Sequence, residues 1–436
     1  MALKCLKIRP RRKPREDKRA TLNSNRGQHV QGFRSSHTLP CRPQRHRAPV
    51  LVDTPKVTIP FTARFRSGTG NVVSADRARI DAIKSKNYGV APATHKRTSY
   101  SIAATNDAIA YTTPVGVGVP ATNYTLLIDI GNAITSIGAD KPYVKTNTSV
   151  DTGETVEVTS GLGSCFGTAY YDTLTLSPEL VVKKQFICVS SSYSGFPSGI
   201  DGALGLGPTI LSEGTVTGVS EVAAVTDNLY SQGTISTDAV GVFYAPTTNT
   251  STTNGELTFG GPDATKYTGT LTYFPITTTY PASYYWGIDQ SVTYNGATVL
   301  ASTAGIFDTG TTLVYLASDA YNEYVSATGA KLDDTTGLLT ITSAQYAALA
   351  PLNFVVSGTT YTLTANAQIW PRSLNTYIGG TSSTIYLIVN NLGTPSGEGL
   401  DFINGYTFLE RFYSFFDTTN SRIGVATTSY TTATTN

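Results

Sequence analysis

Two short segments constrain the fold of this chain more than any other feature. The segment GIFDTGTTLVYL begins at residue 305 and sets Asp308 and Gly310 between apolar residues. The segment LLIDIGNAITSIG begins at residue 126 and sets Asp129 and Gly131 in the same way, 179 positions earlier. Because Gly permits a sharp turn and apolar flanks favour buried strands, each segment predicts strand, tight turn and strand. The repetition predicts two similar lobes that each present one carboxylate.

A second pair of segments strengthens the repeat. IDGALGLG at 200–207 follows the first Asp loop, and LDFINGYTFL at 400–409 follows the second. The same order of Asp loop and apolar Gly-containing stretch therefore occurs twice. Only 14% of the residues are charged, and 40 Gly and 26 Tyr accompany many Thr, which favours strands and turns. We expect an all-β fold with a few short helices, near residues 221–233, 317–329, 342–349 and 405–412.

The charge of the chain changes sign near residue 97. Residues 1–97 hold 23 Lys and Arg against 5 Asp and Glu, and residues 98–436 hold 9 against 25. The dibasic pair Lys96-Arg97 stands at the change, in a loop-like context. An acidic body makes nucleic acid an unfavourable partner for residues 98–436, because phosphate contacts need cations. The basic arm could bind nucleic acid or cover the acidic body of its own chain.

The basic arm divides into two parts. Residues 1–55 are rich in Arg, Pro, Ser and His without hydrophobic periodicity, so we expect a disordered leader. No apolar signal-peptide core follows the start of the chain. Residues 56–66 predict a strand, and residues 74–86 predict a helix with Ser74 as its N-cap. We therefore divide the chain into a leader (1–55), a second segment (56–97) and a body (98–436).

Histidine use excludes several mechanisms. The four histidines all precede residue 98: His29, His37, His46 and His95. The body therefore cannot run a Ser-His-Asp or Cys-His mechanism or build a zinc site on His, and we expect no cofactor and no metal. No apolar run of about 18 residues is present, so no membrane span is expected. Cys165 and Cys188 could form a disulfide or remain two buried thiols.

Carboxylates, hydroxyls and water remain for catalysis. Two carboxylates held close together share one proton, because like charges resist joint ionisation. One carboxylate can then act as a base toward a bridging water while the other acts as an acid toward a carbonyl oxygen. This chemistry suits hydrolysis of a peptide bond at acidic pH and needs no metal. A lone Asp-Thr-Gly is usually only a turn, but a matched pair with apolar flanks is far more specific.

At these motifs the chain resembles the pepsin-like aspartic peptidases, above all secreted fungal members of that family. The resemblance covers roughly residues 100–436 and rests on the two Asp loops and on DGALGLGP, NGELTFGG, TANAQIWPRSLN and the segment from GEGLDF to the end. It implies a bilobal all-β fold with a cleft between an N-lobe (about 98–270) and a C-lobe (about 271–436). Residues 57–97 resemble the prosegment of such zymogens, with Lys96-Arg97 as the maturation site.

The resemblance also implies an acid endopeptidase that acts on proteins or peptides as a monomer, outside the cell or in a vacuole. Asp129 and Asp308 would be catalytic, and a β-hairpin flap near 157–168 would close over the substrate. Lys84 or Lys86 would neutralise the two aspartates before activation. The substrate-binding residues that the resemblance implies are Gly131, Ser160, Gly161, Gly310, Thr311 and Thr312.

Departures from the family pattern gather at the first half-site. Ile130 and Asn132 stand where the family has Thr and Ser, so the hydroxyl that would bond across to the other loop is missing. Ser136 replaces a Trp and Ser160 replaces the flap Tyr. The leading hypothesis is an acid endopeptidase of reduced rate. The alternatives are a catalytically impaired pseudo-peptidase that binds peptide in its cleft, and a non-proteolytic β-sandwich or sugar-binding module.

Overall fold

The computed structural model describes residues 57–64, 72–86, 110–160, 163–194, 196, 199–249 and 251–436. They belong to one compact unit that runs from Asp53 to Asn436. The leader predicted over 1–55 and the dibasic pair Lys96-Arg97 lie outside the described residues. Within the described ranges, no helix combines the length and the apolar character needed to cross a membrane.

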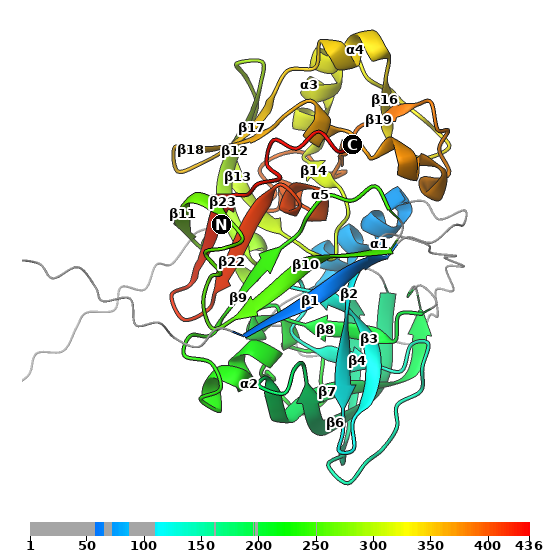
Figure 1. The fold of residues 1–436 in the computed structure, drawn as a ribbon, viewed down its shortest axis with the longest axis vertical. Helices are drawn as coiled ribbons and strands as arrows, with labels where there is room; N and C mark the ends of the chain where they lie inside the picture. Colours follow the sequence, from blue (N-terminus) through cyan, green and yellow to red (C-terminus); the bar gives the residue numbers. More distant parts are fainter. Residues whose placement is uncertain are drawn as a thin grey trace, which may run out of the picture. The chain divides into compact units, whose positions relative to one another are not determined.

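Strands dominate the fold, as predicted (Figure 1). The strands of the first half are β1 (Val57–Arg64), β2 (Ala110–Val117), β3 (Thr122–Asp129), β4 (Thr135–Ile137), β5 (Val150–Ser160), β6 (Gly163–Thr175), β7 (Val181–Ser194), β8 (Gly202–Gly205), β9 (Ala239–Phe243) and β10 (Ser251–Phe259). Those of the second half are β11 (Thr268–Pro275), β12 (Gly287–Tyr294), β13 (Ala297–Phe307), β14 (Val314–Leu316), β15 (Lys331–Leu332), β16 (Leu339–Ile341), β17 (Leu352–Val356), β18 (Thr359–Leu363), β19 (Ile385–Tyr386), β20 (Val389–Asn391), β21 (Phe402–Asn404), β22 (Phe412–Asp417) and β23 (Arg422–Thr427).

The helices are short. The α-helices are α1 (Val72–Ser85), α2 (Val225–Ser231), α3 (Ser318–Thr328), α4 (Ser343–Ala347) and α5 (Tyr406–Leu409). The 3-10 helices are η1 (Thr209–Ser212), η2 (Ala282–Tyr284), η3 (Asn366–Gln368) and η4 (Arg372–Ile378). The four helices predicted in the body are thus confirmed, although α4 and α5 span little more than one turn.

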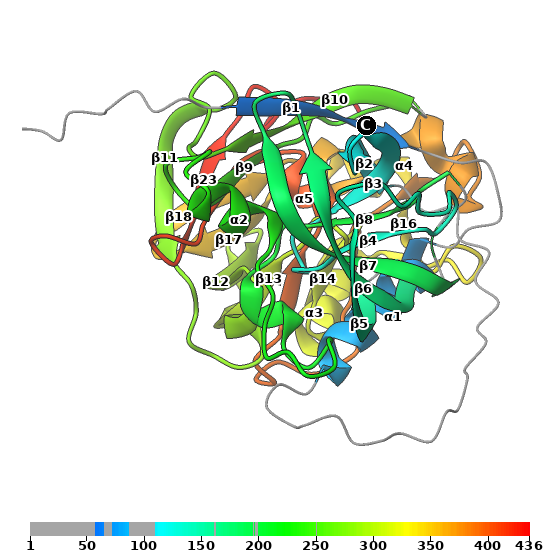
Figure 2. The same cartoon turned by 90° about the horizontal axis from the view of Figure 1, so that it is seen from below.

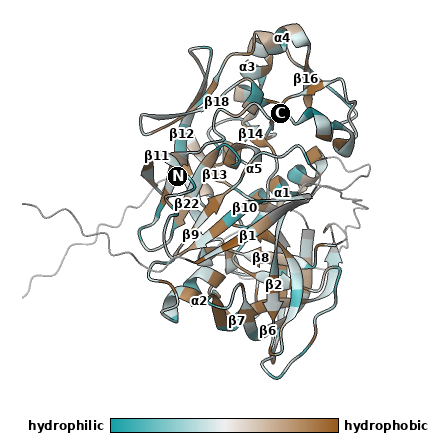
Figure 3. Ribbon diagram, viewed as in Figure 1, coloured by the Kyte–Doolittle hydropathy of each residue, from teal (hydrophilic) through white to brown (hydrophobic). Residues whose placement is uncertain are grey.

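One large sheet joins strands from both ends of the chain. Its thirteen described strands run in the order β11-β23-β22-β9-β10-β1-β2-β3-β8-β4-β7-β6-β5, and a seven-stranded sheet runs β18-β17-β12-β13-β21-β14-β20. A smaller sheet holds β15, β16 and β19. In Figure 1, β1 crosses the middle of the molecule beside β10. Figure 3 shows β9, near the centre, largely in the brown of hydrophobic residues, consistent with its buried residues.

The predicted repeat corresponds to one arrangement of strands that occurs in both large sheets. In the first sheet, β3 pairs parallel with β8, and β4 pairs antiparallel with the same strand. In the second sheet, β13 pairs parallel with β21, and β14 pairs antiparallel with it. Each Asp loop therefore connects two strands that flank a third strand, and that third strand is the apolar Gly segment noted in the sequence. This arrangement holds each Asp turn between paired strands.

The segment before the body contributes β1 and α1 to this unit. β1 lies between β10 and β2 and pairs antiparallel with both. The predicted helix is confirmed, but it begins at Val72, so the prediction of Ser74 as its N-cap is wrong. Val72 and Ala75 are buried, and burial of this first turn outweighs the capping preference of Ser74. Seen from below, α1 lies close to β5, which it contacts (Figure 2).

Candidate active site

The two Asp loops bring their carboxylates into the interior. Asp129 is the last residue of β3, and Asp308 directly follows β13. Both side chains are fully buried. The main-chain N–H of Gly131 donates to Asp129 Oδ1 at 2.9 Å, and that of Gly310 donates to Asp308 Oδ1 at 3.2 Å. Each turn therefore folds back on its own carboxylate, as the repeated Asp-X-Gly spacing predicts.

A single guanidinium from α1 contacts both carboxylates. Arg79 Nη2 donates to Asp129 Oδ1 at 2.6 Å and to Asp308 Oδ1 at 2.5 Å. These two oxygens lie within about 5 Å of each other, close enough for strong repulsion between bare carboxylates. Arg79 Nη1 approaches Asp129 Oδ2 at 3.4 Å, and Nε donates to Asp308 Oδ2. A Cβ on Gly131 or Gly310 would collide with this guanidinium, so both glycines make room for it.

The charge balance of this cluster favours the ion pairs. Arg79 is only 2% exposed. Burial opposes the charge of Arg79, but Asp129 and Asp308 together outweigh burial and raise its pKa above the ordinary value. The guanidinium therefore stays charged and offsets the repulsion between the two carboxylates.

Arg79 makes the hydrogen bonds to both aspartates that were expected of Lys84 or Lys86, and the charge of Asp129 also acts on Lys86. Lys84 Nζ donates to Leu392 O at 2.9 Å, and Lys86 Nζ donates to Leu211 O. Burial lowers the pKa of both lysines, that of Lys86 to about 8. The buried residues of α1 recur on the helical face that carries Arg79, and Lys84 falls outside that face. A forked guanidinium also reaches two carboxylates at once, which a single ammonium does less well.

A second residue of α1, Asp76, also contacts the second Asp loop. Asp76 Oδ1 accepts from the N–H of Thr312 at 2.8 Å, and Oδ2 accepts from the N–H of Leu313 at 2.9 Å. Burial raises the pKa of Asp76 to about 7, and the two N–H groups oppose that rise. Asp76 and Arg79 are one helical turn apart and enclose the loop that carries Asp308.

Arg77 anchors the opposite side of the helix. It donates to the carbonyl oxygens of Leu392 at 2.7 Å and Asn391 at 2.6 Å. These acceptors are main-chain groups at the end of β20. α1 is thus fixed by side chains on more than one face.

The sequence contained a signal for Arg79 and Asp76 that the prediction missed. The buried positions of α1 are Val72, Ala75, Asp76, Arg79, Ile80 and Ile83. Their spacing of three and four residues places the two charged side chains on the apolar face. A charged pair on the apolar side of a short helix indicates a buried polar partner elsewhere in the chain.

The two half-sites differ in their hydroxyl groups. Thr311 Oγ1 donates to Asp308 Oδ2 at 2.5 Å. The position that corresponds to Thr311 in the first loop is Asn132, whose Oδ1 accepts from the N–H of Ile134 at 3.0 Å. Asn132 Nδ2 is buried and has no hydrogen-bond partner among the described residues. Among the residues that the structure describes, Asp129 therefore receives no side-chain hydroxyl comparable to that of Thr311.

Thr309 supplies the hydrogen bonds between the two loops. Its Oγ1 accepts from the N–H of Ile130 at 3.1 Å and donates to the carbonyl of Ile128 at 3.0 Å. A Thr that follows the Asp was expected to form a hydrogen bond across to the other loop, and Thr309 of the second loop forms it. Ile130 cannot return it, because its side chain carries no polar atom.

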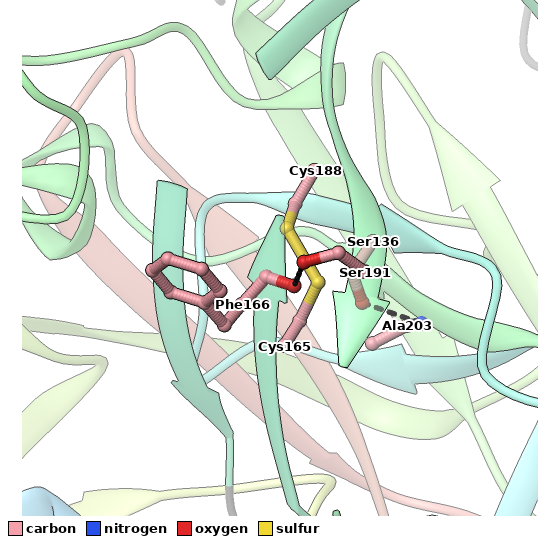
Figure 4. The surroundings of a disulfide bond; sticks show 6 residues. All are labelled: Ser136, Cys165, Phe166, Cys188, Ser191 and Ala203. Carbon is pink, nitrogen blue, oxygen red and sulfur yellow. Dashed lines mark hydrogen bonds between the residues drawn. A yellow bond between two sulfur atoms is a disulfide. The ribbon is translucent and has the colours of Figure 1, made fainter. Parts of the chain in front are cut away.

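A disulfide lies beside the position where the family pattern has a Trp. Cys165 of β6 and Cys188 of β7 are bonded, which resolves the alternative left open by the sequence (Figure 4). Ser136 lies next to this disulfide, and its Oγ accepts from the N–H of Ala203 at 3.2 Å (Figure 4). Ser136 and both cysteines are at most 2% exposed. The space near Ser136 is therefore filled by the disulfide and by the neighbouring strands.

The predicted flap corresponds to an antiparallel hairpin. β5 and β6 pair from Val150 to Ser160, where Ser160 faces Gly163 in the register. Gly161, which was predicted to bind substrate, lies outside the described residues. Thr312, from the same prediction, lies in the second Asp loop with its N–H bound to Asp76. No cluster of three or more His, Cys, Asp or Glu side chains that could hold a metal occurs in the described part of the chain.

Comparison with known proteins agrees with this geometry. The family model for eukaryotic aspartyl proteases matches residues 110–428, and the chain therefore belongs to the pepsin-like aspartic peptidase family. Polyporopepsin from Irpex lacteus is 58% identical over 339 residues, which cover 77% of this chain and 99% of that protein. Pepsin A from Suncus murinus is 28% identical over 331 residues, which cover 72% of this chain and 79% of that protein.

A solved structure shows the same fold. The crystal structure of the aspartic proteinase from Irpex lacteus matches with a TM-score of 0.75 and 51% sequence identity. The match covers 88% of this chain and 100% of the crystallised one. The expected bilobal, mostly β fold is thereby confirmed.

Proposed function

We propose that this chain is the latent form of an aspartic endopeptidase in which Asp129 and Asp308 activate a water molecule. The observation that carries the proposal is the approach of two fully buried carboxylates, on equivalent loops of two sheets, to one guanidinium. Once that guanidinium leaves, the two carboxylates can share one proton. One then takes a proton from water and the other donates a proton to the carbonyl oxygen of the substrate.

We further propose that residues 56–97 form an inhibitory prosegment and that residues 98–436 form the enzyme body. Arg79 occupies the position that a catalytic water would need, because it contacts the inner oxygens of both aspartates. Asp76 occupies two main-chain N–H groups of the second Asp loop. After removal of α1 these donors would be open to the main-chain carbonyls of a peptide substrate. Cleavage after Lys96-Arg97 would separate α1 from the body.

The other expectations from the family follow as parts of the same proposal. The β5–β6 hairpin would act as the flap, with Ser160 and Gly161 near the substrate. Gly131, Gly310, Thr311 and Thr312 would line the substrate site around the dyad. The Cys165–Cys188 disulfide supports an oxidising compartment and therefore a secreted protein. We propose a monomer that acts on proteins and peptides without a cofactor.

The catalytically impaired alternative has specific support. Ile130 supplies no hydroxyl, the Nδ2 group of Asn132 is unpaired among the described residues, and Ser136 stands beside a disulfide. Loss of one preorganised donor costs about 3 kcal/mol of transition-state stabilisation in comparable sites. A peptide-binding cleft without turnover is thus the second candidate function.

The test uses the full chain, because β1 pairs with two strands in the middle of the large sheet. One sample of the full chain is first treated briefly with trypsin, which can cut after Arg97, and a second sample is not. Both are then incubated at about pH 4, where a dyad of this kind shares its proton. Cleavage of acid-denatured haemoglobin is measured for the wild type, Asp129→Asn and Asp308→Asn. The proposal predicts cleavage by the wild type alone. Binding of a peptide by all three proteins without cleavage would establish the impaired form.

A further inference from the structure

Within the described residues, one hydroxyl of the Asp loops hydrogen-bonds directly from one loop to the other. Thr309 Oγ1 bonds to the N–H of Ile130 and to the carbonyl of Ile128, and so fixes the main chain on both sides of Asp129. In the first loop, the residue that corresponds to Thr309 is Ile130. Since Ile130 has no hydroxyl, the position of Asp129 relative to Asp308 depends on how firmly Thr309 is held.

Thr309 has bonding capacity left. A hydroxyl has one donor and two acceptor lone pairs. The donor of Thr309 Oγ1 is used on Ile128 and one lone pair is used on Ile130. One lone pair remains for a further donor, and a buried acceptor is more firmly placed when its full capacity is used.

Tyr244 brings a donor to this place. Its side chain is fully buried, and its hydroxyl makes no hydrogen bond of ordinary geometry within the described part of the chain. Burial raises the pKa of Tyr244 well above its ordinary value, and the nearby Thr309 side chain opposes that rise. Tyr111, whose ring stacks on that of Tyr244, directly precedes Thr112, and Thr112 pairs with Leu127 just before Asp129, so Tyr244 lies near the first Asp loop. The phenol is therefore a protonated donor at acidic and neutral pH, beside Thr309.

The ring of Tyr244 is fixed by an aromatic cluster. Tyr111 stacks on it with ring centroids 4.1 Å apart and an interplanar angle of 19°. Phe61 meets the same ring edge-on at 4.8 Å. Tyr111 is itself held, because its hydroxyl donates to Glu410 Oε1 at 2.6 Å. Tyr244 also directly follows the buried central strand β9. These contacts fix the ring and leave the hydroxyl little freedom beyond rotation about its C–O bond.

We propose that Tyr244 is a positioning residue whose hydroxyl donates to Thr309 Oγ1 and thereby holds the main chain around Asp129. In this role it supports the Thr309 link, which residue 130 cannot duplicate because it has no hydroxyl. In the latent form this contact lacks the geometry of a hydrogen bond, and on this proposal it closes in the working site, as hydrogen bonds at catalytic centres often do. The inference concerns the same dyad as the proposed function and rests on it for its effect on catalysis.

The first measurement does not depend on activity. Hydrogen exchange of the full chain is followed by mass spectrometry for peptides that cover residues 126–134. Tyr244→Phe removes only the hydroxyl and should speed exchange there about threefold to tenfold, the range expected for loss of one neutral hydrogen bond. Tyr324→Phe is the matched control. Tyr324 lies in α3 and is also fully buried, and its hydroxyl donates to Gln368 Oε1 at 3.0 Å. That control should leave exchange over residues 126–134 unchanged.

The second measurement uses the activated full chain and steady-state kinetics. Tyr244→Phe should lower kcat by about threefold to tenfold with little change in KM, since the dyad and not substrate binding is disturbed. In an Ile130→Thr background the same substitution should lower kcat by less than about twofold, because the new hydroxyl would complete the link from the other side. A purely structural role would produce equal losses in both backgrounds.

The outcomes separate this inference from the proposed function. Faster exchange near Asp129 in Tyr244→Phe and not in Tyr324→Phe supports the inference even if the wild type cleaves nothing. Unchanged exchange over residues 126–134 overturns it, whatever the wild-type activity. Equal kcat losses with Thr or Ile at residue 130 overturn it as well.

Discussion

Arg79 offers the sharpest test of latency, because one side chain contacts both candidate catalytic groups. Its guanidinium makes four hydrogen bonds to Asp129 and Asp308, and none of the three side chains is more than 2% exposed. Arg79→Gln removes the charge and leaves two buried carboxylates without a cation. Breaking a buried ion pair in this way costs about 3 to 5 kcal/mol. The docked state of α1 should therefore lose about two to nearly four orders of magnitude in stability relative to the undocked state.

The assay is the initial rate of peptide cleavage by the unprocessed full chain at about pH 4, followed by the rate after removal of α1 with trypsin. Arg79→Gln should show activity before processing and wild-type activity after it. Arg79→Lys should be intermediate, because an ammonium keeps the charge but lacks the fork that contacts both carboxylates.

Arg77→Gln is the matched control for this experiment. It removes a guanidinium from the same helix, but one that contacts the main-chain oxygens of Leu392 and Asn391. It should release far less activity than Arg79→Gln. The reasoning is refuted if Arg79→Gln stays as silent as the wild type before processing while both are equally active afterwards. Equal release by Arg77→Gln would show that α1 is held by its total charge and not by its contact with the dyad.

Three further predictions follow from other contacts. Burial raises the pKa of Glu410 from 4.5 to about 7. The contribution of Glu410 to stability is therefore complete below about pH 4.5 and is lost as the pH rises through 7. Glu410→Gln should reduce the fall in unfolding free energy over this pH range by about 3 kcal/mol, measured by urea denaturation at several pH values. Thr311→Val should lower kcat about tenfold to a hundredfold with KM nearly unchanged, because Asp308 loses a charge-assisted hydrogen bond. Steady-state kinetics at constant pH test this, and an unchanged kcat would contradict it. Cys165→Ser should leave Cys188 as a thiol that reacts with a thiol reagent only after denaturation. The same variant should lower the unfolding free energy by about 3 kcal/mol, as expected for a closed loop of this length. Reaction of Cys165 and Cys188 in the denatured, unreduced wild type would contradict the disulfide.

The features that the sequence predicted are those encoded locally and repeated. Asp129 and Asp308 could be found because each stands in a short motif with the same spacing of Gly and apolar residues. The strands that flank them and the Gly-containing strands β8 and β21 follow from the same repetition. Local patterns suffice for such elements, since burial of both faces of a strand leaves a nearly continuous apolar run.

The features that were missed depend on contacts between distant segments. Arg79 and Asp308 are 229 positions apart, and nothing in the local sequence of either names the other. Lys84 and Lys86 were chosen by residue type alone. The face of α1 that packs into the site determines which cation contacts the two aspartates. Cys165 and Cys188 are not partners in the β6–β7 register, where Cys165 faces Tyr193 and Cys188 faces Ala169, so their pairing depends on the three-dimensional arrangement of the two strands.

The asymmetry of the two half-sites explains how the two carboxylates can stay in place beside so many departures from the family pattern. The changes at Ile130 and Asn132 remove hydroxyl groups from the first loop only. The second loop keeps Thr309, which bonds to the main chain on both sides of Asp129, and Thr311, which bonds to Asp308. Because main-chain groups of the first loop are the partners, its side chains can change without breaking that link. One complete half-site can therefore position both carboxylates, and loss of a hydroxyl from Thr309 or Thr311 should disturb their positions most.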